Sequence, residues 1–321
     1  MNGSFFKQAI ATLGLMAMLK GQPAIVKQEN KSLIRASDSI GLITHSTDSL
    51  VEKIESDITA DNSPEYFLKK QEFNQVQYFF EENYEPNDFK PLTKQKAETL
   101  IELLQDSVEQ VNNRDFYYTN QAGGCLNSVL WATSLAREYN IDLKPVIVND
   151  SHVAAVLSTT KGDLYFNLPS SDSRTRAEMI KKYSPNPKKL ALGYHMRILD
   201  LDKKEDYNAL KALIIYNNSI RELRAYEQIR KQLGLSQTEI KILYGNQGLI
   251  HDSNYPESYK PRIEKAINTL KQSIRLLERA ARTDPKNPDI LEGLKEQYNS
   301  EEIDDSFRAE QVNKRIQKLM K

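Results

Sequence analysis

One cysteine stands where the sequence could support nucleophilic chemistry. Cys125 is the only cysteine in the chain, and it follows Gly123-Gly124 at the head of a segment with helical spacing of apolar residues. The reactive form of cysteine is the thiolate, and the positive end of a helix favours that form. The two glycines let backbone come close and leave the sulfur uncovered. The first turn of the helix could also offer the Cys125 N–H to an oxyanion.

A thiol nucleophile needs a base, and His152 is placed to serve as one. It lies 27 residues after Cys125 and opens an apolar, strand-like run. A third group should orient the imidazole through its other ring nitrogen, and Asn167, a further 15 residues along, is the candidate. The three residues therefore suggest a Cys-His-Asn site that acts on acyl or amide bonds.

The register of the hairpin after His152 decides how close Asn167 comes to it. A turn centred on Thr159-Thr160 places Asn167 opposite His152, at about 5 Å. A turn centred on Lys161-Gly162 moves Asn167 a few residues along and weakens the pair.

Each of the three residues also has a structural explanation. A lone cysteine often serves as a small buried apolar residue, and a histidine on a strand is often held by structural hydrogen bonds. An asparagine near a strand end often serves a turn. The order of the three residues along the chain is more specific evidence for a catalytic site than any one of them alone.

The elements around these residues predict an α+β fold. Two helices are expected first, one from Pro64 and one from Thr93, and a third begins at Cys125. Three strand-like runs then follow at Pro145–Val148, His152–Leu157 and Leu164–Leu168. From about Tyr207 the pattern is helical, with expected helices at 207–233, 236–249, 258–283, 287–299 and 305–320.

The segment that runs from Gly123 to Leu168 resembles the core of the transglutaminase-like superfamily. The matching residues are Cys125, Leu135-Ala136-Arg137, Ile141, His152-Val153 and Gly162 through Asn167. The resemblance implies a papain-like core with a Cys-His-Asp type triad, in which Asn167 replaces the usual aspartate. Asp172 is the alternative third member, and Gln121 is a candidate oxyanion donor. Cleavage of amide bonds is favoured over crosslinking, because crosslinking needs a second site for an amine.

The helical tail resembles tetratricopeptide repeats. The residues that carry this likeness are Ser273, Leu277, Ala280 and Pro285, which follow the pattern of small, large apolar, small and proline. The resemblance implies a surface that binds a protein or peptide, either as substrate or as partner. Two alternatives remain open: an inert core with a partner-binding tail, and a purely structural helical subdomain.

Four regions are expected along the chain. They are a signal peptide or N-terminal helix at 1–24, a polar linker at 25–61, the transglutaminase-like domain at 62–204 and the helical domain at 205–321. The apolar run near the N-terminus is too short to span a membrane. The chain is expected in the cytoplasm, or outside the cell if the first segment is a signal peptide.

Composition narrows the classes of partner and cofactor. The formal net charge is zero, which gives no reason to expect nucleic acid. One cysteine forms neither an internal disulfide nor a cysteine-rich zinc site. His45, His195 and His251 show no partners at ligand spacing, so no metal or cofactor is expected. Lys181-Lys182 and Lys188-Lys189 are expected to form a small basic patch near a proline-containing loop.

Overall fold

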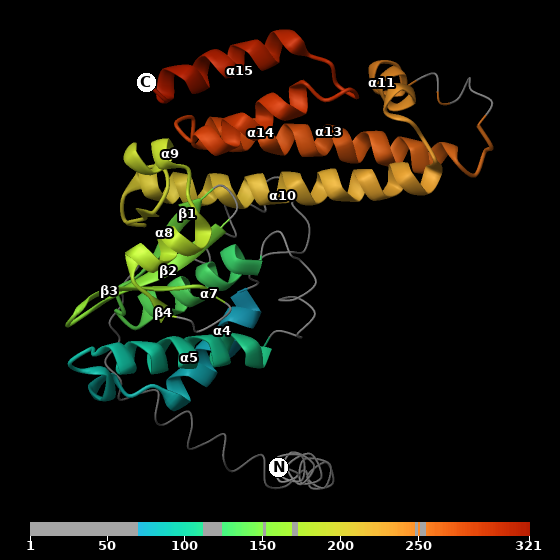
Figure 1. Cartoon of the computed structure of the whole chain (residues 1–321). Helices are drawn as coiled ribbons and strands as arrows, with labels where there is room; N and C mark the ends of the chain where they lie inside the picture. Colours follow the sequence, from blue (N-terminus) through green and yellow to red (C-terminus); the bar gives the residue numbers. More distant parts are fainter. Residues whose placement is uncertain (1–69, 112–123, 150–151, 169–172, 248–249, 251–254) are drawn as a thin grey trace, which may run out of the picture. The chain divides into compact units, whose positions relative to one another are not determined.

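The computed structural model describes residues 70–111, 124–149, 152–168, 173–247, 250 and 255–321. All of them belong to one compact unit. The described chain combines many helices with one antiparallel sheet (Figure 1), which confirms the α+β class. The expected segments 1–24 and 25–61 lie outside the described residues and stay predictions.

One antiparallel sheet carries two of the three candidate residues. Its strands stand in the order β4-β3-β2-β1-β5. The strands are β1 (Leu143–Asn149), β2 (His152–Thr159), β3 (Gly162–Phe166), β4 (Ser173–Arg174) and β5 (Arg197–Ile198). The three longer strands confirm the strand-like runs of the sequence. The two edge strands are two residues long, which is too short for an alternating pattern to reveal them.

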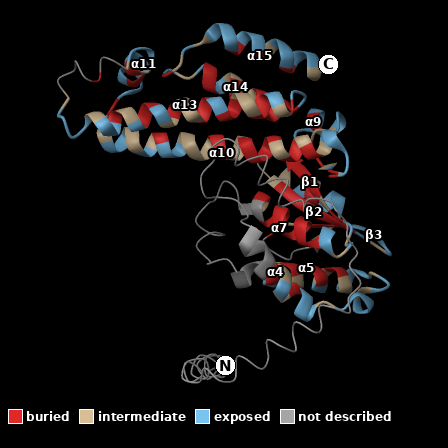
Figure 2. Cartoon of the chain, turned by 180° about the vertical axis from the view of Figure 1, so that it is seen from behind, coloured by how far each residue is buried: buried red, intermediate tan, exposed pale blue. Residues whose placement is uncertain are grey.

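Helix α7 (Gly124–Glu138) covers one face of this sheet. Helices α5 (Lys94–Val111) and α4 (Lys70–Asn83) continue this layer, since α5 contacts α7 and α4 contacts α5. The short 3-10 helix η2 (Pro86–Phe89) joins α4 to α5. The core of this face combines α7 with alternate residues of the strands, among them Leu130, Trp131, Leu135, Ile147, Val153, Ala155, Leu157 and Phe166. Seen from behind, the described parts of α7 and of the strands are largely buried (Figure 2).

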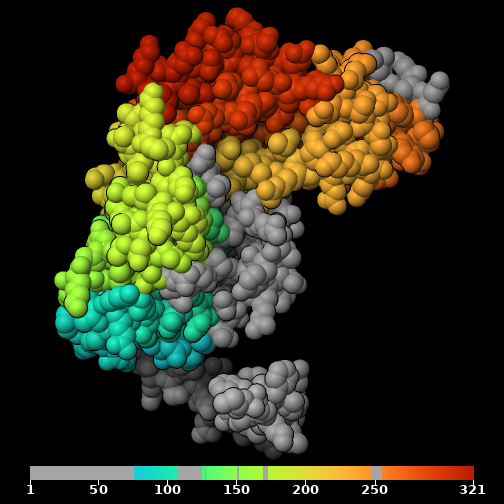
Figure 3. Space-filling model, viewed as in Figure 1, coloured from blue at the N-terminus to red at the C-terminus, as the bar shows by residue number. Residues whose placement is uncertain are grey.

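Helix α8 (Arg176–Tyr183) lies on the opposite face of the sheet. It packs on the other set of alternate strand residues, which with its own Met179 comprises Val146, Val148, Ala154, Val156, Tyr165 and Met196. A capping box begins the helix: the Thr175 hydroxyl accepts from the Glu178 N–H, and the Glu178 carboxylate accepts from the Thr175 N–H. Residues of α8 and of the short helix α9 (Pro187–Ala191) cover the sheet in the space-filling view (Figure 3, yellow-green).

The expected basic patch at Lys181-Lys182 and Lys188-Lys189 is wrong in part. These residues lie in α8 and α9, on either side of the short connection that holds Pro185, but the Lys189 side chain is only 3% exposed. Its ammonium is paired with carboxylates, because a buried cation must be compensated. The sequence pattern showed the charge but not the partners.

The described residues from Lys204 onward are largely helical, as predicted. Their helices are α10 (Lys204–Leu233), α11 (Gln237–Gly245), α13 (Lys260–Thr283), α14 (Pro288–Tyr298) and α15 (Ser306–Leu319). Helices α10 and α13 lie side by side over much of their length, and α14 pairs with both α13 and α15 (Figure 1). Gly234 ends α10 with φ of 67°, the left-handed conformation that a C-terminal glycine adopts readily.

Small residues allow the close approach of these helices. Ser273 of α13 is buried, and its hydroxyl donates to the Ser219 carbonyl of α10 at 2.8 Å. Gly293 of α14 faces the Tyr216 ring, where an added Cβ would lie 3.0 Å from ring atoms. The small position of the repeat-like pattern at Ser273 therefore serves a helix crossing.

Helix α10 contributes to two apolar cores. Tyr207, Leu210, Leu213 and Ile214 pack in the core between α7 and the sheet. Ala212, Ile215 and Tyr226 pack with α11, α13, α14 and α15. The expected boundary between the two domains falls at Lys204, the first residue of α10. None of the described helices is long and apolar enough to cross a membrane.

Candidate functional site

Cys125 occupies the first turn of α7, as the sequence indicates. It is the second residue of this helix, its thiol is free, and it is partly exposed. Its position at the helix N-terminus is the one that favours a thiolate. Gln121, the candidate oxyanion donor, lies outside the described residues, and so does Asp172, the alternative third member of the site.

His152 is the first residue of β2 and pairs with Asn149 of β1. Along β2 the side chains alternate, so His152 shares the face of Ala154 and Val156, which is the face that α8 covers. Its imidazole stacks on the Tyr183 ring at the end of α8, with centroids 4.1 Å apart and planes inclined by 13°.

Asn167 follows β3 and comes next to His152. The β2–β3 hairpin pairs Thr159 with Gly162, so the turn is centred on Thr160-Lys161 and neither of the two expected registers is right. Gly162 has φ of 113°, which a side chain would make costly. Because Phe166 pairs with Ala155, Asn167 lies diagonal to His152 on the same face, within reach of its ring.

Burial sets the charge state of His152. Desolvation lowers the pKa of His152 to about 4, hydrogen bonding with the Asn167 side chain opposes this shift, and the Lys182 ammonium adds to it. The ring is therefore neutral at physiological pH. Its Nε2 is buried and has no hydrogen-bond partner.

The structure brings His152 and Asn167 together, but it does not join Cys125 to them. The helix that carries Cys125 covers one face of the sheet, whereas His152 and Asn167 extend from the other. No hydrogen bond links the Cys125 sulfur to His152 among the described residues, and the ring is stacked on Tyr183 instead. The start of α7 and the start of β2 nevertheless belong to the same end of the sheet, since α7 and β1 run in opposite directions.

A second cluster of polar residues was not predicted. His195, Lys189 and Asp289 meet where α9 approaches α14, and all three are buried. The Lys189 ammonium donates to Asp289 and, at 2.6 Å, to Glu292. The His195 Nδ1 accepts from the Asn186 N–H at 3.2 Å, so its Nε2 carries the proton that Asp289 accepts, also at 3.2 Å.

The partners in this cluster hold Lys189 and Asp289 in their charged forms. Burial alone would raise the pKa of Asp289, but hydrogen bonds from His195 and Lys189 keep that pKa below its ordinary value. Burial would lower the pKa of Lys189, but its bonds to Asp289 and Glu292 raise it. Asp289 is about one hundred residues from Lys189 and His195 in the sequence, so no local spacing could have revealed this cluster.

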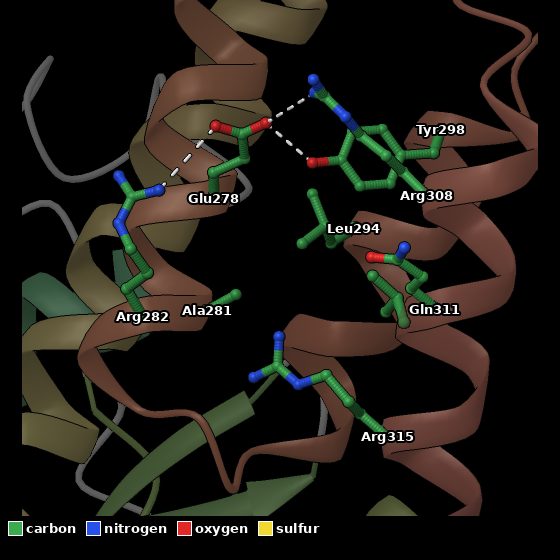
Figure 4. A pocket seen from close by; sticks show the side chains of 9 residues that line it. Glu278, Ala281, Arg282, Leu294, Tyr298, Arg308, Gln311 and Arg315 are labelled. Carbon is green, nitrogen blue, oxygen red and sulfur yellow. Dashed lines mark hydrogen bonds and ion pairs between the residues drawn. The ribbon is translucent and has the colours of Figure 1, made fainter.

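A pocket of about 410 Å³ opens between α13, α14 and α15. Its lining residues are Glu278, Ala281, Arg282, Leu294, Tyr298, Arg308, Gln311, Val312 and Arg315 (Figure 4). Three arginines and one glutamate make the lining cationic. Within the described part of the chain, no group of three or more His, Cys, Asp and Glu side chains is arranged to hold a metal.

Comparison with protein-family models, with curated proteins and with solved structures finds no match to this chain.

Proposed function

We propose that this chain is a transglutaminase-like protein that acts as a partner-binding module through α13, α14 and α15. The observation that carries this proposal is that the His152 ring stacks on Tyr183, while its Nε2 has no hydrogen-bond partner among the described residues. A thiol and its base must come within hydrogen-bond reach for nucleophilic catalysis. Here the imidazole faces away from α7 and stacks on Tyr183.

The helices from α10 to α15, here called the helical half, support the binding role. Helices α13, α14 and α15 pack as antiparallel neighbours, and the repeat-like pattern at Ser273, Leu277 and Ala280 places small and apolar residues in their core. Repeats of this type stack helix pairs and leave a surface that binds peptides. The pocket between α13, α14 and α15 is consistent with such a role.

Mapping of the partner contact by hydrogen exchange tests the proposal. The full-length protein is captured with its cross-linked partner from its native cells, and amide exchange is compared with and without the partner. We expect protection within α13–α15 and the same capture by Cys125→Ala. Loss of capture in Cys125→Ala, or protection confined to α7 and β2, would overturn the proposal.

A second candidate function is a thiol enzyme that cleaves amide bonds. The placement of Asn167 beside His152 on one face of the sheet favours it, because this is the pair that would orient a catalytic imidazole. Cys125 would attack a carbonyl, with His152 taking the proton and returning it to the leaving amine. This mechanism requires the ring to leave Tyr183 and turn toward the start of α7.

Activity-based labelling distinguishes the two functions. A peptide with a C-terminal chloromethyl ketone alkylates a cysteine that is activated by an imidazole. The thiol enzyme predicts labelling of Cys125 that is lost in His152→Ala and reduced in Asn167→Ala. The binding module predicts equal, slow labelling in all three proteins.

A further inference from the structure

The pocket between α13, α14 and α15 has an apolar floor and polar walls. Ala281, Leu294 and Val312 form the floor, and all three are buried. In Figure 4 the Glu278 carboxylate lies on one wall, and the Arg315 guanidinium extends into the cavity from the opposite side. A ligand here meets apolar and charged groups at once.

The only carboxylate of the lining is already compensated. Glu278 accepts from the Tyr298 hydroxyl at 2.7 Å, and Arg308 lies 3.5 Å from the same oxygen. Arg282 lies 3.8 Å from its other oxygen. The attraction of this wall for further cations is therefore reduced.

Arg315, by contrast, has no hydrogen bond or ion pair with any residue that the structure describes. A guanidinium presents a planar fork of donors that matches a carboxylate. Gln311, one turn earlier on α15, adds an amide beside it (Figure 4). The free donors of the pocket thus point to an acidic group on the ligand.

An exposed aromatic ring extends this surface. Phe307 lies four residues before Gln311 and eight before Arg315, so the three share one face of α15. Its side chain is 72% exposed, the largest value among the exposed large apolar residues of the described chain. Exposed aromatics beside arginines are typical of the energetic centres of protein interfaces.

We infer that this pocket binds an acidic peptide segment of a partner protein. An Asp or Glu carboxylate of the peptide pairs with Arg315, and a neighbouring apolar side chain covers the floor at Leu294 and Val312. Phe307 packs on the next apolar residue of the peptide. The inference rests on the proposed partner-binding function and names the chemistry of the partner.

A phosphate-bearing ligand such as nucleic acid fits the pocket less well. Its backbone has no apolar group to cover the floor at Leu294 and Val312. A carboxylate flanked by apolar side chains satisfies both the guanidinium of Arg315 and this floor.

Peptide libraries of matched composition test the inference on the full-length protein. One fluorescein-labelled octapeptide library draws each position from Asp, Glu, Leu, Phe, Ser and Gly, and the second replaces Asp and Glu with Asn and Gln. Fluorescence anisotropy should show about tenfold tighter binding of the acidic library. Arg315→Gln should remove this preference, whereas Lys318→Gln, an exposed charge on the same helix, should keep it within about twofold.

Three results would overturn the inference. They are equal binding of the two libraries, retention of the preference by Arg315→Gln, and displacement of the acidic library by an unstructured oligonucleotide at equal concentration. Arg315 is exposed, so Arg315→Gln should unfold at the wild-type temperature. Partner protection on α13–α15 with no acidic preference would reject this inference and leave the proposed function standing.

Discussion

The imidazole of His152 lies flat on the ring of Tyr183, and this stack directs it away from the helix that bears Cys125. A neutral, desolvated imidazole next to Asn167 has the chemistry of a base, yet its surroundings are those of a structural residue. His152 can serve Cys125 as a base only after its ring leaves Tyr183. Activation of the thiol by this imidazole therefore depends on how stable the stack is.

The reactivity of Cys125 should be ordinary. Without an imidazole in hydrogen-bond contact, iodoacetamide at neutral pH should label Cys125 no faster than it labels cysteine in a short unstructured peptide. The rate is measured by mass spectrometry of the full-length protein. His152→Ala should leave it unchanged, and a rate tenfold above the peptide would instead support the enzyme.

His152 should titrate far below an ordinary histidine. The chemical shift of its ring protons should report a pKa near 4 in the folded protein. Tyr183→Ala, which opens the stack to water, should raise this pKa toward 6.5. Tyr183→Phe keeps the ring and should leave the value unchanged, and a wild-type pKa near 6.5 would contradict the burial argument.

The same shift predicts how stability depends on pH. The unfolded chain takes up its proton near pH 6.5 and the folded ring only near 4, so protonation favours unfolding between these values. The stabilisation is complete above pH 6.5 and is lost as the pH falls toward 4, by about 3 kcal/mol. Urea unfolding of wild type and His152→Gln across this range measures it, and the variant should show a flatter profile.

The buried pair of Lys189 and Asp289 should be costly to break. Asp289→Ala leaves a buried ammonium short of one partner, which should lower the free energy of unfolding by about 3 kcal/mol. The double variant Lys189→Met with Asp289→Leu should lose less than the two single variants together. Strict additivity in urea unfolding would show that the pair is not coupled.

Gly293 should resist substitution although it lies within a helix. Alanine normally favours a helix over glycine by about 1 kcal/mol. Here its Cβ would meet the Tyr216 ring at 3.0 Å, so Gly293→Ala should destabilise the protein by about 1–2 kcal/mol. Adding Tyr216→Leu should recover part of the loss, and a more stable Gly293→Ala would show that the ring moves aside.

The sequence predicts the described helices and longer strands well, because their apolar spacing is regular. The helix at Cys125, the hairpin after His152 and the five helices from Lys204 onward all follow such patterns. The sequence does not predict the short elements between Ser173 and Ile198. There the helices have only two turns or less, and the edge strands have two residues, so no periodicity can develop.

The site shows what sequence spacing leaves undetermined. The hairpin expected after His152 is present, with His152 opening β2 and Asn167 directly following β3. The spacing did not determine the face of the sheet, because a shift of one residue in a strand turns a side chain to the other side. The pairing of β1 with β2 shifts register between Ile147 and Asn149, just before His152. No composition pattern reveals such an irregularity.

Helix α10, which is thirty residues long, links the unfolding of the two parts of the molecule. One flank of this helix belongs to the core beneath the sheet and another belongs to the helical half, so neither half keeps its apolar surface covered alone. Heating should therefore give a single calorimetric transition. A substitution that loosens the core at Trp131 should therefore also loosen the pocket between α13, α14 and α15.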